Sequence, residues 1–220
     1  MKKLFFAVVI TAVTMTSINA QKFGAKVGLN LANITGDNTD GNKMQIGAHI
    51  GGFAEFEITE QFAFQPEILF SMQGYKNESN TETNIGGIVS KSNIELSAKM
   101  NYINIPLMFK YYVTEGISLE LGPQIGFLIS AKADSSVKTK ITDGTTVLSE
   151  INSEANGTDV KDNIKSLDYG LNIGVGYKME NGLLFGARYN LGLANLNDLE
   201  GTDFSNKNSV ISISVGYFFN

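Results

Sequence analysis

The sequence predicts an all-β protein, an eight-stranded antiparallel up-and-down transmembrane β-barrel with short periplasmic turns and long extracellular loops. Residues 167–179 (LDYGLNIGVGYKM) alternate strictly between apolar positions and polar or glycine positions, which is the period of a strand with two unlike faces. On the apolar face, Tyr169 and Tyr177 flank aliphatic side chains, as in a strand that crosses a bilayer. The connections between such segments alternate between long, polar stretches and turns of a few residues, which is typical of outer-membrane barrels.

Seven other segments continue the alternation, which brings the predicted number of strands to eight. They cover residues 23–31, 44–58, 62–75, 102–113, 117–131, 183–193 and 209–219. An even number of strands returns both ends of the barrel to the periplasmic side, and eight strands enclose a lumen that side chains nearly fill. Pro66 and Pro106 lack a backbone donor, so we expect a local bulge at each.

The connections differ in length and composition. Short turns are expected at residues 59–61, 114–116 and 180–182, and long polar loops at 33–43, 76–98, 132–163 and 196–207. The 76–98 segment is interpreted as a loop, with strand-like extensions above the membrane as an alternative. The 132–163 segment is the longest loop, and its residues Thr145 to Ala155 have a weak helical pattern.

The N-terminus resembles a secretory signal peptide. Lys2 and Lys3 precede a short apolar run, and a spanning helix would need about twenty apolar residues. We expect cleavage after Ala20, which divides the chain into a signal peptide (1–20) and an outer-membrane β-barrel domain (21–220). Export through this signal, together with the barrel pattern, predicts the cell outer membrane as the destination.

Composition excludes several classes of protein. Cleavage would remove two lysines and no acidic residue, so the formal net charge falls from −5 to −7, which disfavours a nucleic-acid partner. The chain has no cysteine, which excludes disulfides, thiolate metal sites and a lipid anchor on cysteine.

Charged residues fall on the face of the strands that points into the lumen. The residues expected to form a structural charge network there are Lys26, Glu55, Glu67, Lys110, Glu120, Asp168 and Arg188, with Glu57 and Lys178 in the same register. In a narrow barrel these groups cannot all be solvated separately, so we expect an interlocked network of ion pairs and hydrogen bonds that plugs the lumen and fixes the register of the strands. The alternative is a charge-lined, selective channel.

No other residues form a convincing catalytic or metal site. His49 is the only histidine, and a catalytic role would need a nucleophile and an orienting carboxylate that no motif supplies, so we expect it to pack in the lumen. The run Asp37 to Asn42 (DNTDGN) lacks the ligand spacing of a calcium loop and is interpreted as a solvated turn. No cofactor is predicted.

Four segments together resemble the PorT-like outer-membrane β-barrel family of Bacteroidetes. They are FGAKVGLNLANITGD at the start of the mature chain, NYINIPLMFKYY, LELGPQIGFLIS and the final SISVGYFF. The resemblance extends over essentially all of residues 21–220 and implies the barrel fold and an outer-membrane location. The family is functionally mixed, and its namesake acts in protein secretion and in the maturation of secreted proteases.

The leading hypothesis is a small non-enzymatic outer-membrane barrel that acts through its surface loops or as a scaffold. Its expected partners are outer-membrane lipid and secretion or surface proteins that contact loops 132–163 and 76–98. The alternatives are an accessory component of a secretion and maturation apparatus, a narrow passive channel, an enzyme acting on lipid or peptide, and a soluble lipocalin-like barrel.

Overall fold

Nine strands and one short 3-10 helix make up the structure, a computed structural model that describes residues 21–199, 201 and 203–219. The predicted signal peptide lies outside these residues. The elements are β1 (Gln21–Gly36), β2 (Asn42–Glu57), β3 (Phe62–Ile85), β4 (Ile88–Tyr112), β5 (Ile117–Asp143), β6 (Thr146–Asp159), η2 (Lys161–Asn163), β7 (Leu167–Lys178), β8 (Leu183–Gly192) and β9 (Asn206–Phe219). No helix among the described residues is long and apolar enough to cross a membrane.

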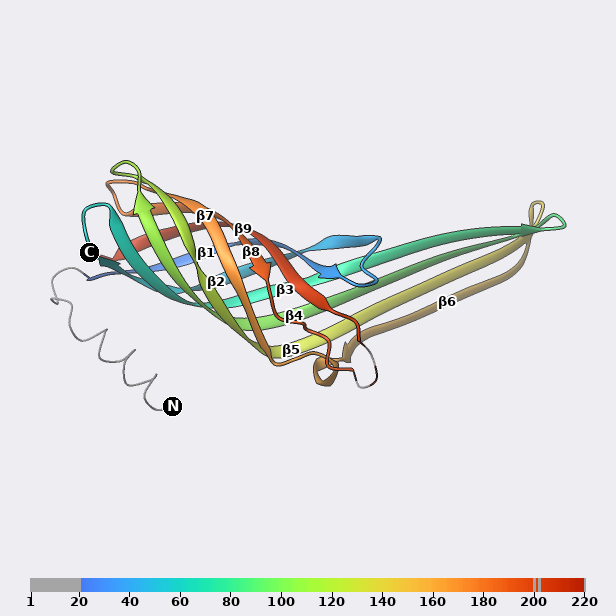
Figure 1. Cartoon of the computed structure of the whole chain (residues 1–220). Coiled ribbons are helices and arrows are strands. Elements are labelled where there is room, and N and C mark those ends of the chain that lie inside the picture. Colours follow the sequence, from blue (N-terminus) through green and yellow to red (C-terminus); the bar gives the residue numbers. More distant parts are fainter. Residues whose placement is uncertain (1–20, 200, 202, 220) are drawn as a thin grey trace.

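The sheet closes on itself through eight of the nine strands. β1 pairs with β2 on one side and with β9 on the other, while β5 pairs with both β4 and β7. All pairings in this ring are antiparallel, and β6 lies outside it, paired only with β5 (Figure 1). The eight-stranded antiparallel barrel predicted from the sequence is therefore confirmed. Closure leaves no unpaired strand edge within the ring, as a lipid environment requires.

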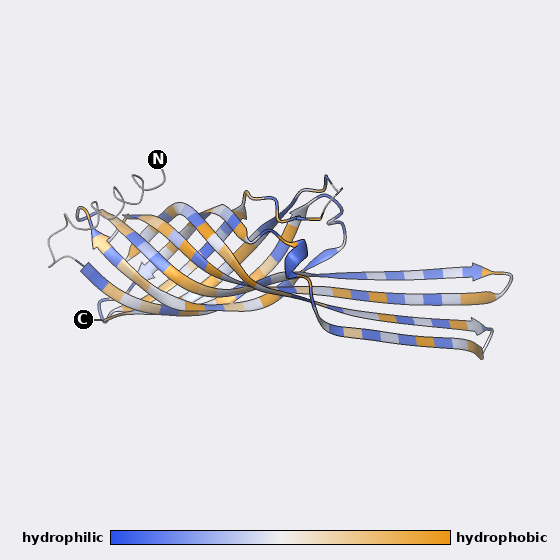
Figure 2. Cartoon of the chain, turned by 90° about the horizontal axis from the view of Figure 1, so that it is seen from below, coloured by the Kyte–Doolittle hydropathy of each residue, from blue (hydrophilic) through white to orange (hydrophobic). Residues whose placement is uncertain are grey.

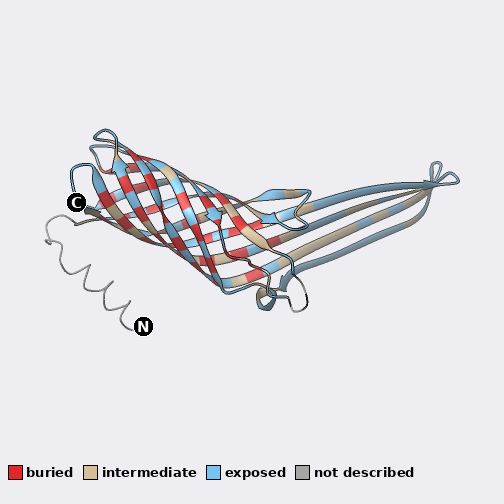
Figure 3. Cartoon of the chain, in the orientation of Figure 1, coloured by how far each residue is buried: buried red, intermediate tan, exposed pale blue. Residues whose placement is uncertain are grey.

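The two faces of the barrel strands differ as the alternation predicts. Along each strand, buried and exposed residues follow one another in turn (Figure 3). On β4, for example, the Phe109 side chain is 56% exposed, whereas its neighbour Lys110 is 1% exposed. The outward-facing apolar run at residues 62–72 of β3 extends about 33 Å along the strand, which a tilt of about 40° reduces to about 25 Å of membrane thickness.

Short turns join the strands at one end of the barrel. They lie at residues 58–61, 113–116 and 179–182, and β1 begins and β9 ends near them (Figure 1). Exposed aromatic rings gather at this end, where the pairs Phe62–Tyr111 and Phe64–Phe109 have ring centroids 5.0 and 5.2 Å apart. This is the arrangement of an aromatic girdle at one membrane interface, and the short turns beside it are typical of the periplasmic side of an outer-membrane barrel.

The segment interpreted as the longest loop, 132–163, is mostly strand, so that interpretation was wrong. The strand-like extensions considered for 76–98 are present and take up nearly all of that segment. β3 and β4 continue to a two-residue tip at Gly86 and Gly87, and β5 and β6 meet at another tip that contains Gly144. Of the residues with the weak helical pattern, Thr145 lies in this tip and residues 146–155 belong to β6, so no helix forms there. The strand signal was missed because both faces of these hairpins are largely polar or hydroxylated, which hides the apolar alternation, although the glycine pair is itself a hairpin signal.

The extended parts of β3, β4, β5 and β6 form a four-stranded sheet outside the barrel, which we call the platform. It comprises residues 75–85, 88–99, 132–143 and 146–159, and it reaches well beyond the β1–β2 hairpin and the β8–β9 connection (Figures 1 and 2). β3 and β5 run away from the membrane along the platform, and β4 and β6 return.

Neither expected proline bulge is present. The β3–β4 ladder pairs Pro66 with Leu107 and resumes with Leu69 opposite Asn104 in the same register. A missing backbone donor removes hydrogen bonds but adds no residue, so the strands stay aligned across the gap. Register shifts lie elsewhere, between Met44 and His49 on β2 and at Asn101/Tyr102 between β4 and β5.

Ile173 provides a test of the lipid-facing surface. Its side chain is 59% exposed near the middle of β7, and Ile173→Arg should lower the free energy of unfolding by about 2–4 kcal/mol, because the charge would enter hydrocarbon. Leu148, on the platform, is similarly exposed at 54%, and Leu148→Arg should have little effect because its surroundings are water. Reversible unfolding in lipid vesicles measures both values. Equal costs for the two substitutions would contradict the assignment of the outer face.

Candidate functional site

Charged side chains from seven strands meet inside the barrel. Six of the seven residues predicted for the lumen network lie together there, in a chain of alternating acids and bases. Its members are Lys26 on β1, Glu67 on β3, Arg188 on β8, Glu120 on β5, Lys110 on β4, Glu55 on β2 and Lys178 on β7. Of the eight strands of the ring, only β9 contributes no member to this chain.

Arg188 connects the two halves of this series of ion pairs. Its Nη2 donates to Glu67 Oε1 at 2.8 Å, and its Nε donates to Glu120 Oε2 at 2.6 Å. Glu67 also pairs with Lys26, so one carboxylate binds two cations. The side chains of Lys26, Glu67, Arg188 and Glu120 are each less than 10% exposed. The Glu67 carboxylate stabilises the buried charges of Lys26 and Arg188, which have little water around them to solvate them.

Lys110 continues the chain toward the periplasmic end. Its Nζ lies 2.7 Å from Glu55 Oε2 and 3.7 Å from Glu120 Oε1. Glu55 also accepts from the Tyr112 hydroxyl at 2.8 Å and lies 3.4 Å from Lys178 Nζ. The network therefore spans the lumen from wall to wall, because each charge bridges groups on different strands.

Asp168 lies apart from this network. Its Oδ2 accepts from Asn208 Nδ2 at 2.8 Å, close to the Tyr102 hydroxyl and toward the extracellular end. Sequence reasoning also missed Gln65, which donates to Glu67 at 2.6 Å and accepts from Lys110 at 3.1 Å. Its inward position on β3 was visible in the alternation, but a neutral amide was not considered as part of a charge network.

A layer of amides lies next to the ion pairs. Asn172 Nδ2 donates to Gln124 Oε1, and Asn190 Nδ2 donates to Asn172 Oδ1, each at 3.1 Å. The cavity beside these groups is only about 40 Å³, and Gln73 Oε1 and Asn104 Oδ1 face it without a hydrogen-bond partner. Such a space holds one or a few waters.

Apolar clusters cover both ends of the polar interior. Phe53, Leu184 and Phe218 pack together near the periplasmic end, where the Phe53 and Phe218 rings meet edge to face at 5.0 Å. At the extracellular end, apolar side chains from β1, β3 and the β6–β7 connection pack against one buried cluster. It consists of Met100, Tyr102, Leu128 and Ala131, with Ile34, Tyr75, Val160 and Ile164 packed against it. An apolar cluster therefore lies at each end of the polar interior.

His49 and Asp37, two residues considered as candidate catalytic or metal-binding groups, each contact a neighbouring strand or loop. His49 is buried in the lumen, with Nδ1 2.8 Å from Asn30 Oδ1. Its ring also occupies the space beside Gly28, where a Cβ would lie 2.5 Å from His49 Cε1. Asp37 lies in the β1–β2 connection, and its carboxylate accepts from the Ser205 backbone N–H at 2.9 Å. Among the described residues, no group of three or more acidic or histidine side chains is arranged to hold a metal ion.

The platform has two chemically different faces. Residues opposite each other in an antiparallel ladder lie on the same face, and the ladders here place Ser79, Ile94, Val137 and Ser153 in one row. We call this the uncharged face, because Asp143 at the tip is its only charged residue. It carries Tyr75, Asn77, Ser79, Thr81, Thr83, Ile85, Ile88, Ser90, Ser92, Ile94, Leu96, Ala98, Ala133, Ser135, Val137, Thr139, Ile141, Asp143, Thr146, Ser149, Ile151, Ser153, Ala155 and Thr158.

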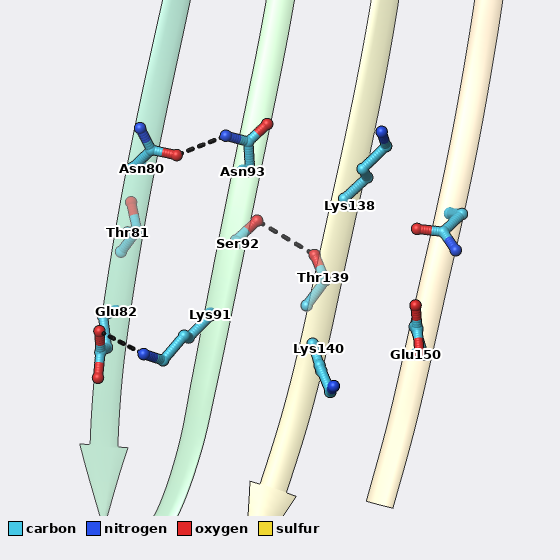
Figure 4. A pocket seen from close by; sticks show the side chains of 11 residues that line it. Asn80, Thr81, Glu82, Lys91, Ser92, Asn93, Lys138, Thr139, Lys140 and Glu150 are labelled. Carbon is cyan, nitrogen blue, oxygen red and sulfur yellow. Dashed lines mark hydrogen bonds and ion pairs between the residues drawn. The ribbon is translucent and has the colours of Figure 1, made fainter. Parts of the chain in front are cut away.

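The opposite side, the charged face, holds all the other charged residues of the platform. These are Lys76, Glu78, Glu82, Lys91, Glu95, Lys99, Lys132, Asp134, Lys138, Lys140, Glu150, Glu154 and Asp159. Figure 4 shows the middle of this sheet, where Glu82 lies 3.1 Å from Lys91 and Asn93 donates to Asn80 at 2.6 Å. Nearer the membrane, a hydrogen bond from the Lys99 ammonium lowers the pKa of Asp134.

The faces exchange polarity where the strands leave the membrane. On β3, the positions that face lipid at Ile68, Phe70 and Met72 continue into Lys76 and Glu78 on the charged face. The positions that face the lumen continue into the uncharged face. The change from aliphatic to charged side chains places the membrane surface near residue 74 of β3.

The chain matches the family described as "Outer membrane protein beta-barrel domain" over residues 19–198. The chain belongs to this family. It is thus a small outer-membrane β-barrel protein, although the match ends before β9, the strand that closes the ring. A search of curated proteins found no match.

Solved structures that this chain resembles include three proteins of low sequence identity. Ail, the attachment invasion locus protein of Yersinia pestis, has 11% identity and a TM-score of 0.39, with 90% of this chain and 99% of that chain covered. Neisserial surface protein A has 13% identity and a TM-score of 0.40, with 90% and 97% covered. CarO2 of Acinetobacter baumannii has 9% identity and a TM-score of 0.37, with 90% and 99% covered.

Neutralising one member of the lumen network should destabilise the barrel strongly. Glu67→Gln removes the negative charge shared by Lys26 and Arg188, and we expect a loss of about 3 kcal/mol in the free energy of unfolding because two buried cations lose their counter-charge. Glu82→Gln is the matched control, since Glu82 pairs with Lys91 on the exposed platform. It should cost less than about 1 kcal/mol. Similar losses in vesicle unfolding experiments would refute the structural role of the network.

Proposed function

We propose that this protein is a non-enzymatic, non-conducting anchor in the outer membrane that holds the platform outside the cell for contact with other surface or secreted proteins. The barrel supplies rigid attachment to lipid. The two segments expected to contact partners, 76–98 and 132–163, lie in the two hairpins of the platform. The observation that carries the proposal is the platform itself, a regular sheet that extends well past the barrel (Figure 1).

The packing of the lumen supports the non-conducting part of the proposal. The interior is filled by paired charges and amides, and apolar clusters cover both ends. An ion that crossed would have to break buried pairs without water to replace them, which costs far more than permeation through a hydrated pore. A narrow passive channel is therefore the weaker candidate.

An accessory role in protein secretion and maturation is the alternative that the PorT-like resemblance implies. It agrees with a platform that contacts exported proteins, and it differs from the leading proposal in requiring a stable complex with secretion components. Purification from mild detergent distinguishes the two, since the alternative requires such components to remain bound in stoichiometric amounts.

Conductance in planar bilayers tests the closed lumen. The purified barrel should show no steady current in monovalent salt, whereas a porin reconstituted in the same lipid shows open steps. Steady openings that survive repeated insertion events would contradict the proposal and favour the channel.

Shortening the platform tests its role. Asn77 is opposite Leu96 and Ser135 is opposite Ala155, so an Asn-Gly turn can replace residues 78–95 and another can replace 136–154 without changing the register. Cells with this shortened barrel should have the same altered surface-protein profile as cells that lack the protein. The matched control, Gly86→Asn, keeps the platform and should preserve the wild-type profile. A wild-type profile from the shortened barrel would refute the proposal.

A further inference from the structure

The uncharged face is a surface of aliphatic and hydroxyl side chains that nothing in the described chain covers over its outer part. Exposed aliphatic side chains lie along it, among them Ile94 at 36%, Leu96 at 46% and Ile151 at 55% exposure. Rows of serine and threonine separate them, such as Ser92 and Thr139, whose hydroxyl oxygens lie 3.1 Å apart. Such a face, nearly free of charge and with exposed aliphatic side chains between the hydroxyls, can pack against a second sheet.

We propose that the uncharged face packs against the uncharged face of a second copy of this chain, so that two platforms form a two-layer β-sandwich outside the cell. The inference rests on the proposed function, in which the platform is the contact surface of the protein. It identifies the occupant of one face and leaves the charged face available to other partners.

Membrane insertion limits how two copies can meet. Both copies enter the bilayer in the same orientation, so a two-fold axis that relates them runs along the membrane normal. Rotation about such an axis brings identical faces together while every strand keeps its inward or outward direction. A face-to-face contact is therefore isologous and closes at two copies.

The area of the face is sufficient for a specific contact. Four strands at about 4.8 Å spacing and about 30 Å of free length give about 600 Å² per copy, or about 1,200 Å² in total. This reaches the lower end of the range for stable protein interfaces, which is about 1,200–2,000 Å².

The distribution of charge favours this face over the other surfaces of the platform. On the charged face, Lys91 is directly opposite Lys140, and a second copy would add further charges to be buried. The two free strand edges carry acids, Glu78 and Glu82 on β3 and Glu150 and Glu154 on β6. Aligned edge-to-edge pairing would bring these carboxylates together, which opposes extension of the sheet by another copy.

Cysteine cross-linking in intact outer membranes tests the contact, because the chain has no native cysteine. Ser92→Cys and Thr139→Cys lie on the uncharged face, and the neighbouring pair Asn93→Cys and Lys138→Cys lies on the charged face of the same two strands. With a short thiol cross-linker, each single-cysteine variant of the first pair should give a dimer band as the main product, and each single-cysteine variant of the second pair should give almost none. This contrast is informative because Lys138 is more exposed than Thr139, so random collisions would cross-link the charged face first.

A charge on the uncharged face should prevent the contact. Thr139→Lys should convert a detergent-solubilised dimer to a monomer in sedimentation equilibrium, whereas Asn93→Lys on the charged face should leave the dimer. The unheated gel mobility of the folded barrel confirms that both variants fold. Equal cross-linking from the two faces, a monomer in the wild type, or cross-links from Thr139→Cys only to a different protein would each overturn the proposal.

The two proposals fail separately. If the wild type is a monomer and cells with the shortened barrel still have the surface profile of cells without the protein, the dimer is refuted. The proposed function of the platform then stands. If the shortened barrel preserves the wild-type profile while the face-specific dimer is present, the dimer stands and the proposed function of the platform is wrong.

Discussion

Closure of the backbone hydrogen-bond ring is the constraint on which the rest of this structure depends. A sheet in lipid cannot leave an edge unpaired, so β1 must pair with β9 as well as with β2. Eight strands satisfy this at a small radius, and the small radius in turn fixes what the lumen can contain. With little room for water inside, every inward charge has to meet its counter-charge on a facing wall.

The lumen network is one consequence of that small radius. Glu67 on β3 binds Arg188 on β8 across 121 positions in the sequence, and Lys110 on β4 binds Glu55 on β2 across 55. The first pair crosses the barrel, and the second joins the two strands on either side of β3. Both pairs fix the alignment of the strands, because a shift of one residue would move an entire strand's charges into lipid. These buried pairs support the proposed non-conducting anchor, whose contacts lie outside the membrane.

The platform is the other consequence, since strands that leave the membrane lose the constraint of lipid on their outer face. β3 carries Met72 outward in the bilayer and Lys76 outward a few residues later, while its inner positions change from Gln73 to Ser79 and Thr81. The result is a sheet whose polarity is reversed relative to the barrel beneath it. Its uncharged side is then the surface that water solvates least well, and this is the physical basis for expecting it to be covered.

The sequence by itself determined the barrel, because lipid outside and a crowded lumen inside impose a period of two that Leu167 to Met179 displays directly. It also placed inward the residues that meet in the network, including Lys26, Glu67 and Arg188. Only the tertiary structure decided their partners, since Asp168 has the same alternation as Glu120 yet pairs with Asn208 instead. The same holds for the platform: water on both sides removes the strong apolar alternation, so residues 76–98 and 132–163 showed their strand character only through the pairing of neighbouring strands.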